Sequence, residues 1–184
     1  MKSLFNESEH VCDASPLPPS GACFSNDRRF RYNLWRSWAP GDSITFLMLN
    51  PSIADEITMD RTVTRCFNFS KSFGFGTMCI TNVFPLVSPY PIDLLTSLDR
   101  DGEGRRNLEH LAANLRASSA LVIAFGTWPM RRELRYALGP IGDVVLQSGI
   151  VPQALAINAD GSGKHPLYVA GSTSLIPFVW PTKR

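Results

Sequence analysis

The 184-residue chain lacks the features that mark membrane and secreted proteins. No segment reaches the roughly 18 consecutive apolar residues that a membrane-spanning helix needs. The N-terminal region also has no apolar core of the kind found in secretory signals. These absences predict a cytoplasmic protein with no membrane partner.

Signatures of metal and cofactor binding are missing as well. The four cysteines, Cys12, Cys23, Cys66 and Cys79, show no C-x-x-C spacing, and a zinc site built on Cys12, Cys23 and His10 would lack its fourth ligand. Cys66 and Cys79 are therefore expected to be buried thiols. The sequence contains no phosphate-binding P-loop and no dinucleotide fingerprint. We expect no metal and no cofactor.

The composition that remains is ordinary for one folded domain. Hydrophobic residues make up 44% and charged residues 18% of the chain, and the net charge is +2. The basic residues are unevenly spread, with one cluster at Arg28, Arg29, Arg31 and Arg36 and another at Arg131, Arg132 and Arg135. Two interpretations stay open for these clusters: contacts to phosphates, or solvated faces of helices and strands.

Prolines divide the chain into a flexible arm and a domain. Residues 1–25 are predicted to be a poorly ordered N-terminal arm, because Pro16, Pro18, Pro19 and Gly21 block regular structure. Residues 26–184 are predicted to form a single α/β domain. Its weaker elements are expected to be a half-exposed edge strand at 28–38, a short basic helix at 128–138, and short strands at 144–146 and 154–157.

Hydrophobic patterning predicts the core of that domain. Apolar runs at 44–49, 77–83 and 120–125 indicate buried strands, whereas helical spacing indicates helices at 60–73 and 102–117. Fully apolar strands need cover on both faces. The predicted fold is therefore a three-layer α/β/α sandwich with a short, mostly parallel central sheet.

Polar residues gather directly after the first core strand. In α/β proteins ligands bind at the carboxyl ends of strands, so Asn50 is a candidate to orient a water and Ser52 to hold a phosphate or a base edge. The alternative is that both satisfy backbone groups in a turn. Asp55 is a candidate general base, or a metal ligand together with Glu56 and Asp60.

The start of the following helix adds further candidates for substrate binding. Asp60 is either a ligand-binding carboxylate or an ordinary helix N-cap beside Thr62. Arg65 lies one turn into the helix, where it can pair with a carboxylate or face a phosphate.

Two later positions complete the candidate site. Asn82 ends the second core strand, where its amide can read a base edge and Phe84 can stack on the base; the alternative is a structural Asn and a core Phe. His165 follows a Gly/Ser loop, and a neutral imidazole there can stabilise a developing oxyanion or transfer a proton.

These motifs occur in a familiar order. They are Arg31-Tyr32, Leu34, Arg36 and Trp38, then Leu49-Asn50-Pro51-Ser52 with Ala54-Asp55, then Asp60, Thr62, Arg65 and Cys66, then Asn82-Val83-Phe84, and His165-Pro166-Leu167-Tyr168. Over about residues 28 to 170 the chain resembles domain-of-unknown-function family 1643. More distantly it resembles the uracil-DNA glycosylase superfamily.

The second resemblance implies a fold and roles for three residues. In that superfamily an Asn-Pro type motif positions the attacking water, a later Asn reads the base, and a histidine faces the base carbonyl as the glycosidic bond breaks. These roles fall on Asn50, Asn82 and His165. The chain departs from the family at Leu49 and Ser52, which alters the expected base pocket. It also has Leu167-Tyr168 in place of the Ser-containing wedge.

Two functions from different classes follow. The first is an N-glycosidic-bond hydrolase, similar to a DNA glycosylase, that acts on a base in nucleic acid or in a nucleotide, with Leu167 as a candidate wedge for base flipping. The alternative is a non-catalytic protein that binds a nucleotide or nucleic acid in the same pocket. A third option is a metal-dependent phosphohydrolase built on Asp55, Glu56 and Asp60.

Overall fold

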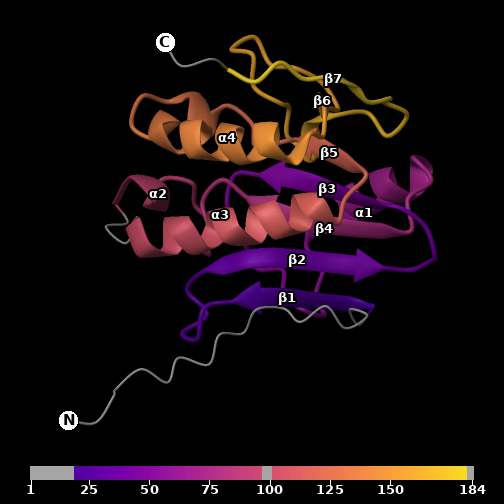
Figure 1. The fold of residues 1–184 in the computed structure, drawn as a ribbon, viewed down its shortest axis with the longest axis horizontal. Helices are drawn as coiled ribbons and strands as arrows, with labels where there is room; N and C mark the ends of the chain where they lie inside the picture. The colour runs from indigo at the N-terminus through magenta and orange to yellow at the C-terminus, as the bar shows by residue number, and fades with distance from the viewer. Residues whose placement is uncertain (1–18, 97–100, 182–184) are drawn as a thin grey trace.

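A seven-stranded sheet forms the centre of the molecule, and helices lie on both of its faces (Figure 1). The computed structural model describes residues 19–96 and 101–181, without the side chains of residues 101–103. The strands run in the order β1-β2-β4-β3-β5-β6-β7 across the sheet. The predicted class, a mixed α/β domain with a partly parallel sheet, is confirmed.

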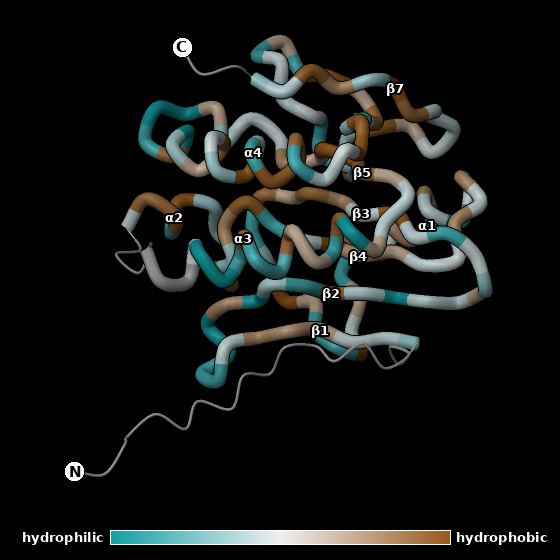
Figure 2. Tube along the Cα trace, in the orientation of Figure 1, coloured by the Kyte–Doolittle hydropathy of each residue, from teal (hydrophilic) through white to brown (hydrophobic). Residues whose placement is uncertain are grey.

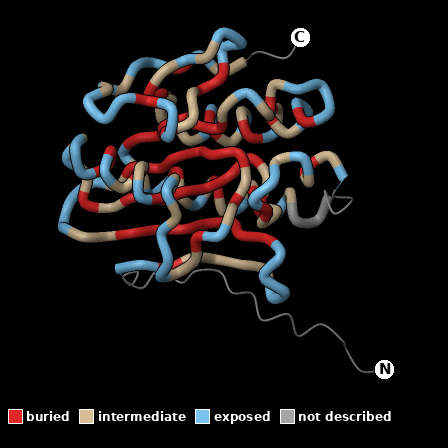
Figure 3. The backbone as a smooth tube through the Cα atoms, turned by 180° about the vertical axis from the view of Figure 1, so that it is seen from behind, coloured by how far each residue is buried: buried red, intermediate tan, exposed pale blue. Residues whose placement is uncertain are grey.

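Four neighbouring strands are parallel and three outer strands are antiparallel. The parallel strands are β3 (Ser43–Met48), β4 (Thr77–Asn82), β5 (Ala120–Ile123) and β6 (Pro152–Ala154). The antiparallel strands are β1 (Ser20–Phe24) and β2 (Arg31–Ser37) at one edge and β7 (Ile176–Pro177) at the other. Figure 2 shows hydrophobic residues concentrated in the central strands, and Figure 3 shows that these strands are buried.

Two hydrophobic clusters occupy the two faces of the sheet. The helices are α1 (Arg61–Ser72), α2 (Asp93–Thr96), α3 (Asp101–Arg116) and α4 (Leu138–Ser148), together with three short 3-10 turns. Val63, Cys66 and Phe69 of α1 pack on one face. Leu111 and Leu115 of α3, with Leu138, Ile141 and Val145 of α4, pack on the other. The layers follow directly from these inward apolar stripes.

The connecting helices change from one face of the sheet to the other after β4. The connection from β3 to β4 runs through α1, whereas the connections from β4 to β5 and from β5 to β6 run through α3 and α4 on the opposite face. β3 therefore lies between neighbours whose connecting helices cover different faces. Such a switch point leaves a crevice at the carboxyl ends of the strands, which is where ligands bind in open α/β sheets.

The core elements agree with the sequence predictions. The three apolar runs form β3, β4 and β5, and the two helical patterns form α1 and α3. Asp60 is the N-cap of α1, because its carboxylate accepts a hydrogen bond from the backbone N–H of Val63 at 2.8 Å. Cys66 and Cys79 are buried free thiols, and burial raises the pKa of the Cys79 thiol to about 12.

The peripheral elements differ from the predictions. Residues 144–146 lie within α4 and not in a strand, because Ile141 and Val145 give a buried helical stripe. The predicted helix at 128–138 is replaced by two 3-10 turns, Trp128–Met130 and Arg135–Ala137, and Leu138 already belongs to α4. The predicted strand at 154–157 shares only Ala154 with β6.

The predicted edge strand lies inside the sheet. β2 pairs with both β1 and β4, and six of its seven residues are buried. Its partner β1 comes from residues 20–24, which the sequence analysis assigned to the flexible arm. Because Gly21 lies where a Cβ atom would come within 2.1 Å of the Trp35 ring, glycine allows this close pairing. Residues 1–18 lie outside the described part of the chain.

Candidate functional site

A pocket of about 450 Å³ lies at the carboxyl ends of β3, β4 and β5, within the size range of small-molecule sites. Six residues that the sequence singles out line it: Asn50, Ser52, Asp60, Thr62, Asn82 and His165. They come from the ends of two strands, the start of α1 and the loop before the 3-10 turn at Pro166–Tyr168. The pocket therefore occupies the crevice that the sheet topology creates.

Asn50 joins the loops that follow β3 and β4. Its Nδ2 donates hydrogen bonds to the backbone carbonyls of Pro51 at 3.0 Å and Ser88 at 2.8 Å, with a longer one to Leu86 at 3.4 Å. Both amide protons are used for this purpose. Its Oδ1 accepts none of the hydrogen bonds found among the described residues, so it is held in a fixed orientation with its lone pairs available to a water or a ligand.

Asn82 is the most deeply buried polar residue of the pocket. Only 1% of its surface is exposed, and within the described residues its buried Oδ1 has no hydrogen-bond partner. Its backbone carbonyl accepts a hydrogen bond from Asn107 at 2.8 Å, which fixes the end of β4. An unsatisfied buried amide costs about 1–3 kcal/mol. An Asn kept at this cost in a pocket wall is suited to binding a ligand.

His165 reaches the pocket from a loop pinned to the end of β5. The backbone N–H of Gly126 donates to the carbonyl of Gly163 at 2.9 Å, and a Cβ atom on Gly163 would lie 2.1 Å from the carbonyl oxygen of Ile123. Only glycine allows this approach. This close approach brings His165 beside the carboxyl end of β5.

The environment of His165 favours the neutral imidazole with its proton on Nε2. Burial lowers the pKa of its side chain, and the nearby Asp60 opposes that shift only in part. Its Nδ1 accepts a long hydrogen bond, 3.4 Å, from the backbone N–H of Leu167. In the neutral ring the other nitrogen then carries the proton. His165 is therefore arranged as a hydrogen-bond donor.

The first turn of α1 supplies the acidic and hydroxyl groups of the pocket. One carboxylate oxygen of Asp60 caps the helix, and the other makes no hydrogen bond among the described residues. Thr62 lies in the same turn and Ser52 on the preceding loop. The N-terminus of a helix favours negative charge, so this wall combines one carboxylate with a positive dipole end.

Four other predicted site residues lie outside the residues that line this pocket. The carboxylate of Asp55 accepts hydrogen bonds from the N–H groups of Ile57 at 2.9 Å and Thr58 at 2.7 Å. These bonds hold the pKa of Asp55 below its ordinary value. Asp55 therefore closes a turn, and its geometry is that of a structural acceptor rather than a general base.

The remaining three contact other parts of the fold. Arg65 donates to the backbone carbonyls of Pro166 and Val169 and so holds the turn after His165. Phe84 packs edge-to-face against Tyr136, with ring centroids 6.2 Å apart. Leu167 is 38% exposed and lies beside the pocket rather than in its lining.

Sequence reasoning missed several lining residues. They are Arg31, Met48, Ser88, Trp128, Asn158, Lys164 and Tyr168. Lys164 and Tyr168 flank the His-Pro motif, so their proximity to His165 was a usable signal. Arg31 had two weaker signals: it belongs to the basic cluster for which phosphate contacts were left open, and its charge stands between the apolar residues Phe30 and Tyr32.

A break in strand register aims Arg31 at the pocket. In the pairing of β1 with β2, Cys23 lies opposite Asn33 but Phe24 lies opposite Arg31, so Tyr32 is an extra residue. A bulge of this kind changes the face to which the next side chain points. Arg31 is 3% exposed, and its Nη1 donates to the carbonyl of Ala54 at 2.6 Å.

The other basic residues of that cluster bind the same loop. Arg36 donates to the carbonyls of Asp55 at 2.7 Å and Thr58 at 3.3 Å. Arg28 forms a bidentate ion pair with Glu56, at 2.8 and 3.0 Å. Arg36 is buried and fits neither open interpretation, whereas Arg28 is exposed, as on a solvated face, and its side chain pairs with Glu56. They anchor the loop that follows the Asn50 motif.

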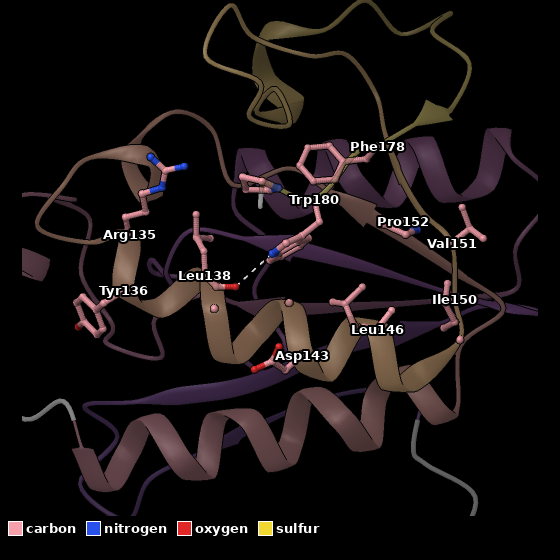
Figure 4. A pocket seen from close by; sticks show the side chains of 15 residues that line it. Arg135, Tyr136, Leu138, Asp143, Leu146, Ile150, Val151, Pro152, Phe178 and Trp180 are labelled. Atoms are coloured by element: carbon pink, nitrogen blue, oxygen red, sulfur yellow. Dashed lines mark hydrogen bonds between the residues drawn. The ribbon is translucent and has the colours of Figure 1, made fainter. Parts of the chain in front are cut away.

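A second and larger pocket has a different character. It measures about 950 Å³ and lies between α4 and the segment that carries Phe178 and Trp180 (Figure 4). The indole N–H of Trp180 donates to the carbonyl of Leu138 at 3.2 Å. None of the predicted site residues lines this pocket. Its walls are mainly apolar, unlike those of the smaller pocket.

Among the described residues, no group of three or more His, Cys, Asp or Glu side chains is placed to hold a metal ion. The metal site considered for Asp55, Glu56 and Asp60 is not assembled, because Asp55 closes a turn and Glu56 pairs with Arg28. In the same part of the chain, no helix is long and apolar enough to cross a membrane.

Comparison with known proteins identifies a family. A family model described as "Protein of unknown function (DUF1643)" matches residues 31–167, so the chain belongs to this family. No curated protein and no solved structure matches the chain. The matched range begins at Arg31 and ends at Leu167, and it contains all the predicted site residues.

Proposed function

We propose that this member of the DUF1643 family hydrolyses the N-glycosidic bond between a nucleobase and its sugar. The observation that carries the proposal is the buried amide of Asn82, whose Oδ1 has no partner among the described residues, in a pocket that also contains Asn50 and His165. The order of the three motifs, which resembles that of the uracil-DNA glycosylase superfamily, gives independent support.

Base recognition falls to Asn82. A carboxamide offers one donor and one acceptor side by side, which matches an N–H and a C=O group that are adjacent on a base edge. Because the amide is buried, it pays its desolvation cost before the ligand arrives. Trp128 and Tyr168 supply aromatic surfaces in the lining on which a base can stack.

The bond is broken by water. In our mechanism Asn50 Oδ1 accepts a hydrogen bond from that water and aims its oxygen at the anomeric carbon. Asp60, not Asp55, is the carboxylate of the pocket, and its uncommitted oxygen takes the proton that the water loses. The carbon–nitrogen bond breaks as the carbon–oxygen bond forms, and the base leaves with the bonding electron pair.

The departing base needs stabilisation as it gains charge. A neutral His165 donates its Nε2–H to an oxygen of the base, where negative charge develops. This role requires a donor rather than a cation, which agrees with the lowered pKa of His165. A residue in this position contributes about 10²–10³ in rate when it supplies one oriented hydrogen bond.

Base release from a substrate panel tests the proposal. The purified chain is incubated, without added metal, with nucleosides, nucleotides, and single- and double-stranded DNA that carries uracil, hypoxanthine or modified bases. We expect release of one base class, slowed roughly a hundredfold in Asn82→Ala and in His165→Ala. Phe84→Leu, outside the pocket, serves as the matched control and keeps its rate. No release from any substrate overturns the proposal.

A second candidate is a nucleotide or nucleic-acid binding protein without catalysis. The observation in its favour is that one Asp60 oxygen and both Asn50 amide protons are already used in structural hydrogen bonds. Tight nucleotide binding without base release, weakened in Asn82→Ala, would support this alternative.

A further inference from the structure

We propose that the floor of this pocket is an oxyanion subsite centred on Arg31, and that the substrate is a free nucleotide whose phosphate binds there. The inference rests on the proposed function and narrows it. It names a mononucleotide, with the phosphate monoester as the anchoring group, in place of a base flipped out of duplex DNA.

The first observation is an incompletely satisfied buried guanidinium. Arg31 Nε is buried and has no hydrogen-bond partner in the described part of the chain. Nη1 is bound to the carbonyl of Ala54, whereas Nη2 makes none of the hydrogen bonds found there. A planar guanidinium with two unused donors on one edge matches a phosphate or carboxylate in bidentate fashion.

The second observation is the lack of a protein counter-ion. Arg31 forms no ion pair with any described residue, although only 3% of its surface is exposed. Burial lowers its pKa to about 10, and the negative charge of Asp60 only partly offsets this. A buried charge without a partner is strongly unfavourable. A bound anion removes this penalty.

Other lining groups favour an anion over a neutral ligand. Lys164 adds a second positive charge, and no described residue forms an ion pair with it. Together Arg31 and Lys164 outweigh the single carboxylate of Asp60, because His165 is neutral at ordinary pH. The hydroxyl of Ser52 is a further donor within the lining.

The depth of Arg31 indicates a small ligand rather than a polymer. Arg31 is 3% exposed, and the pocket lining to which it belongs also includes the buried residues Met48, Val63 and Ile80. A phosphate inside a nucleic-acid strand continues into sugars on both sides, so it cannot end in such a floor. A terminal phosphate can.

The surrounding arginines agree with this reading. Nucleic-acid backbones are held by several exposed Lys and Arg side chains. Near this pocket, however, Arg28 is paired with Glu56, and Arg36 and Arg65 are bound to backbone carbonyls. These three side chains are therefore already bound to protein groups and are not available to a nucleic-acid backbone.

Calorimetric titration of the full chain tests the subsite without requiring turnover. The probes are inorganic phosphate, the nucleoside 5′-monophosphates of uridine, cytidine, adenosine and guanosine with their deoxy forms, the matching nucleosides, and a short single-stranded oligonucleotide. We expect one nucleotide to bind at least about tenfold more tightly than its nucleoside, because it gains a charge-assisted bidentate contact.

Variants locate the effect. Arg31→Lys keeps the positive charge but loses the planar guanidinium that can bind a phosphate in bidentate fashion. The ratio of nucleotide affinity to nucleoside affinity should therefore fall to about threefold or less. Arg132→Gln, a substitution of an exposed arginine outside the pocket, should leave it unchanged. Thermal unfolding checks that Arg31→Lys is folded. If Arg31→Lys is unfolded, the wild-type comparison of nucleotide affinity with nucleoside affinity still tests the subsite.

The outcomes separate this inference from the proposed hydrolysis. Nucleotide binding that depends on Arg31, without base release, supports the subsite and overturns the hydrolysis. Base release from DNA by a chain that binds nucleotides no better than nucleosides overturns the subsite and supports the hydrolysis. The subsite is also overturned if no nucleotide binds, or if the oligonucleotide binds more tightly than every mononucleotide.

Discussion

The side chain of Asn50 donates a hydrogen bond of 2.8 Å to the backbone carbonyl of Ser88, a residue 38 positions further along the chain. This bond ties the loop after β3 to the loop after β4 at the mouth of the pocket. Ser88 is itself buried, and its hydroxyl binds the carboxylate of Asp93 at the start of α2. One amide therefore links two loops that line the pocket, and its oxygen accepts none of the hydrogen bonds found among the described residues.

Replacing Asn50 should affect stability and activity together. In Asn50→Asp the two donors become acceptors that face backbone carbonyls, so we expect the free energy of unfolding to fall by about 1–3 kcal/mol. Base release should fall roughly a hundredfold, because the aimed oxygen is no longer held in place. Denaturant unfolding and the release assay measure the two effects. An Asn50→Asp chain with wild-type stability would contradict the bridging role.

Histidine protonation should weaken the fold at acid pH. Burial lowers the pKa of both His110 and His165 below the ordinary 6.5, so the unfolded chain takes up protons before the folded chain does. Their contribution to stability is complete above about pH 6.5 and is lost as the pH falls through the lowered values. Unfolding of wild type, His110→Gln and His165→Gln from pH 8 to pH 4 measures these contributions.

The same titration should set the acid limb of activity. Donation from Nε2 of a neutral His165 is constant above its pKa. Protonation below it adds a positive charge and removes the Nδ1 acceptor that binds the N–H of Leu167. We expect base release to decline on the acid side, at a pH below that of an ordinary histidine. His110, stacked on Tyr32 with centroids 4.8 Å apart, lies outside the pocket. His110→Gln should leave the pH profile of activity unchanged.

Two arginines that bind the same loop should differ in their effect on it. Arg36 is buried and holds the carbonyls of Asp55 and Thr58, so Arg36→Met should lower the free energy of unfolding by about 2–3 kcal/mol. It should also raise hydrogen exchange across residues 53–59. Arg28→Gln removes an exposed ion pair with Glu56, and we expect no measurable change in Tm. Equal effects of the two substitutions would contradict this distinction.

The sequence predicted those parts of the fold and site that local pattern determines. Continuous apolar runs need burial on both faces, so β3, β4 and β5 were recognisable. Asn50, Asn82 and His165 follow strands or a glycine-rich loop, and the structure brings them to one pocket. Their roles in catalysis stay predictions.

Other positions depend on contacts that no local pattern shows. Arg31 enters the pocket because of a bulge at Tyr32, which appears only when β1 pairs with β2. Val144–Leu146 is too short an apolar run to separate strand from helix, and packing against α3 decided it. The structural role of Asp55 could have been predicted. An Asp side chain commonly closes a turn by accepting hydrogen bonds from the backbone N–H groups two and three residues later.

Gly163 offers a test of how His165 is delivered to the site. A Cβ atom there would meet the carbonyl oxygen of Ile123 at 2.1 Å, a backbone atom that cannot move without disturbing β5. We expect Gly163→Ala to lower the free energy of unfolding by about 1–3 kcal/mol and to impair base release and nucleotide binding. Gly104→Ala is the matched control: Gly104 lies in α3, a Cβ atom there meets nothing within 4 Å, and alanine should stabilise the helix by about 0.5–1 kcal/mol. If Gly163→Ala matched the control in both unfolding and base release, the loop would not depend on this close approach, and another contact would have to position His165.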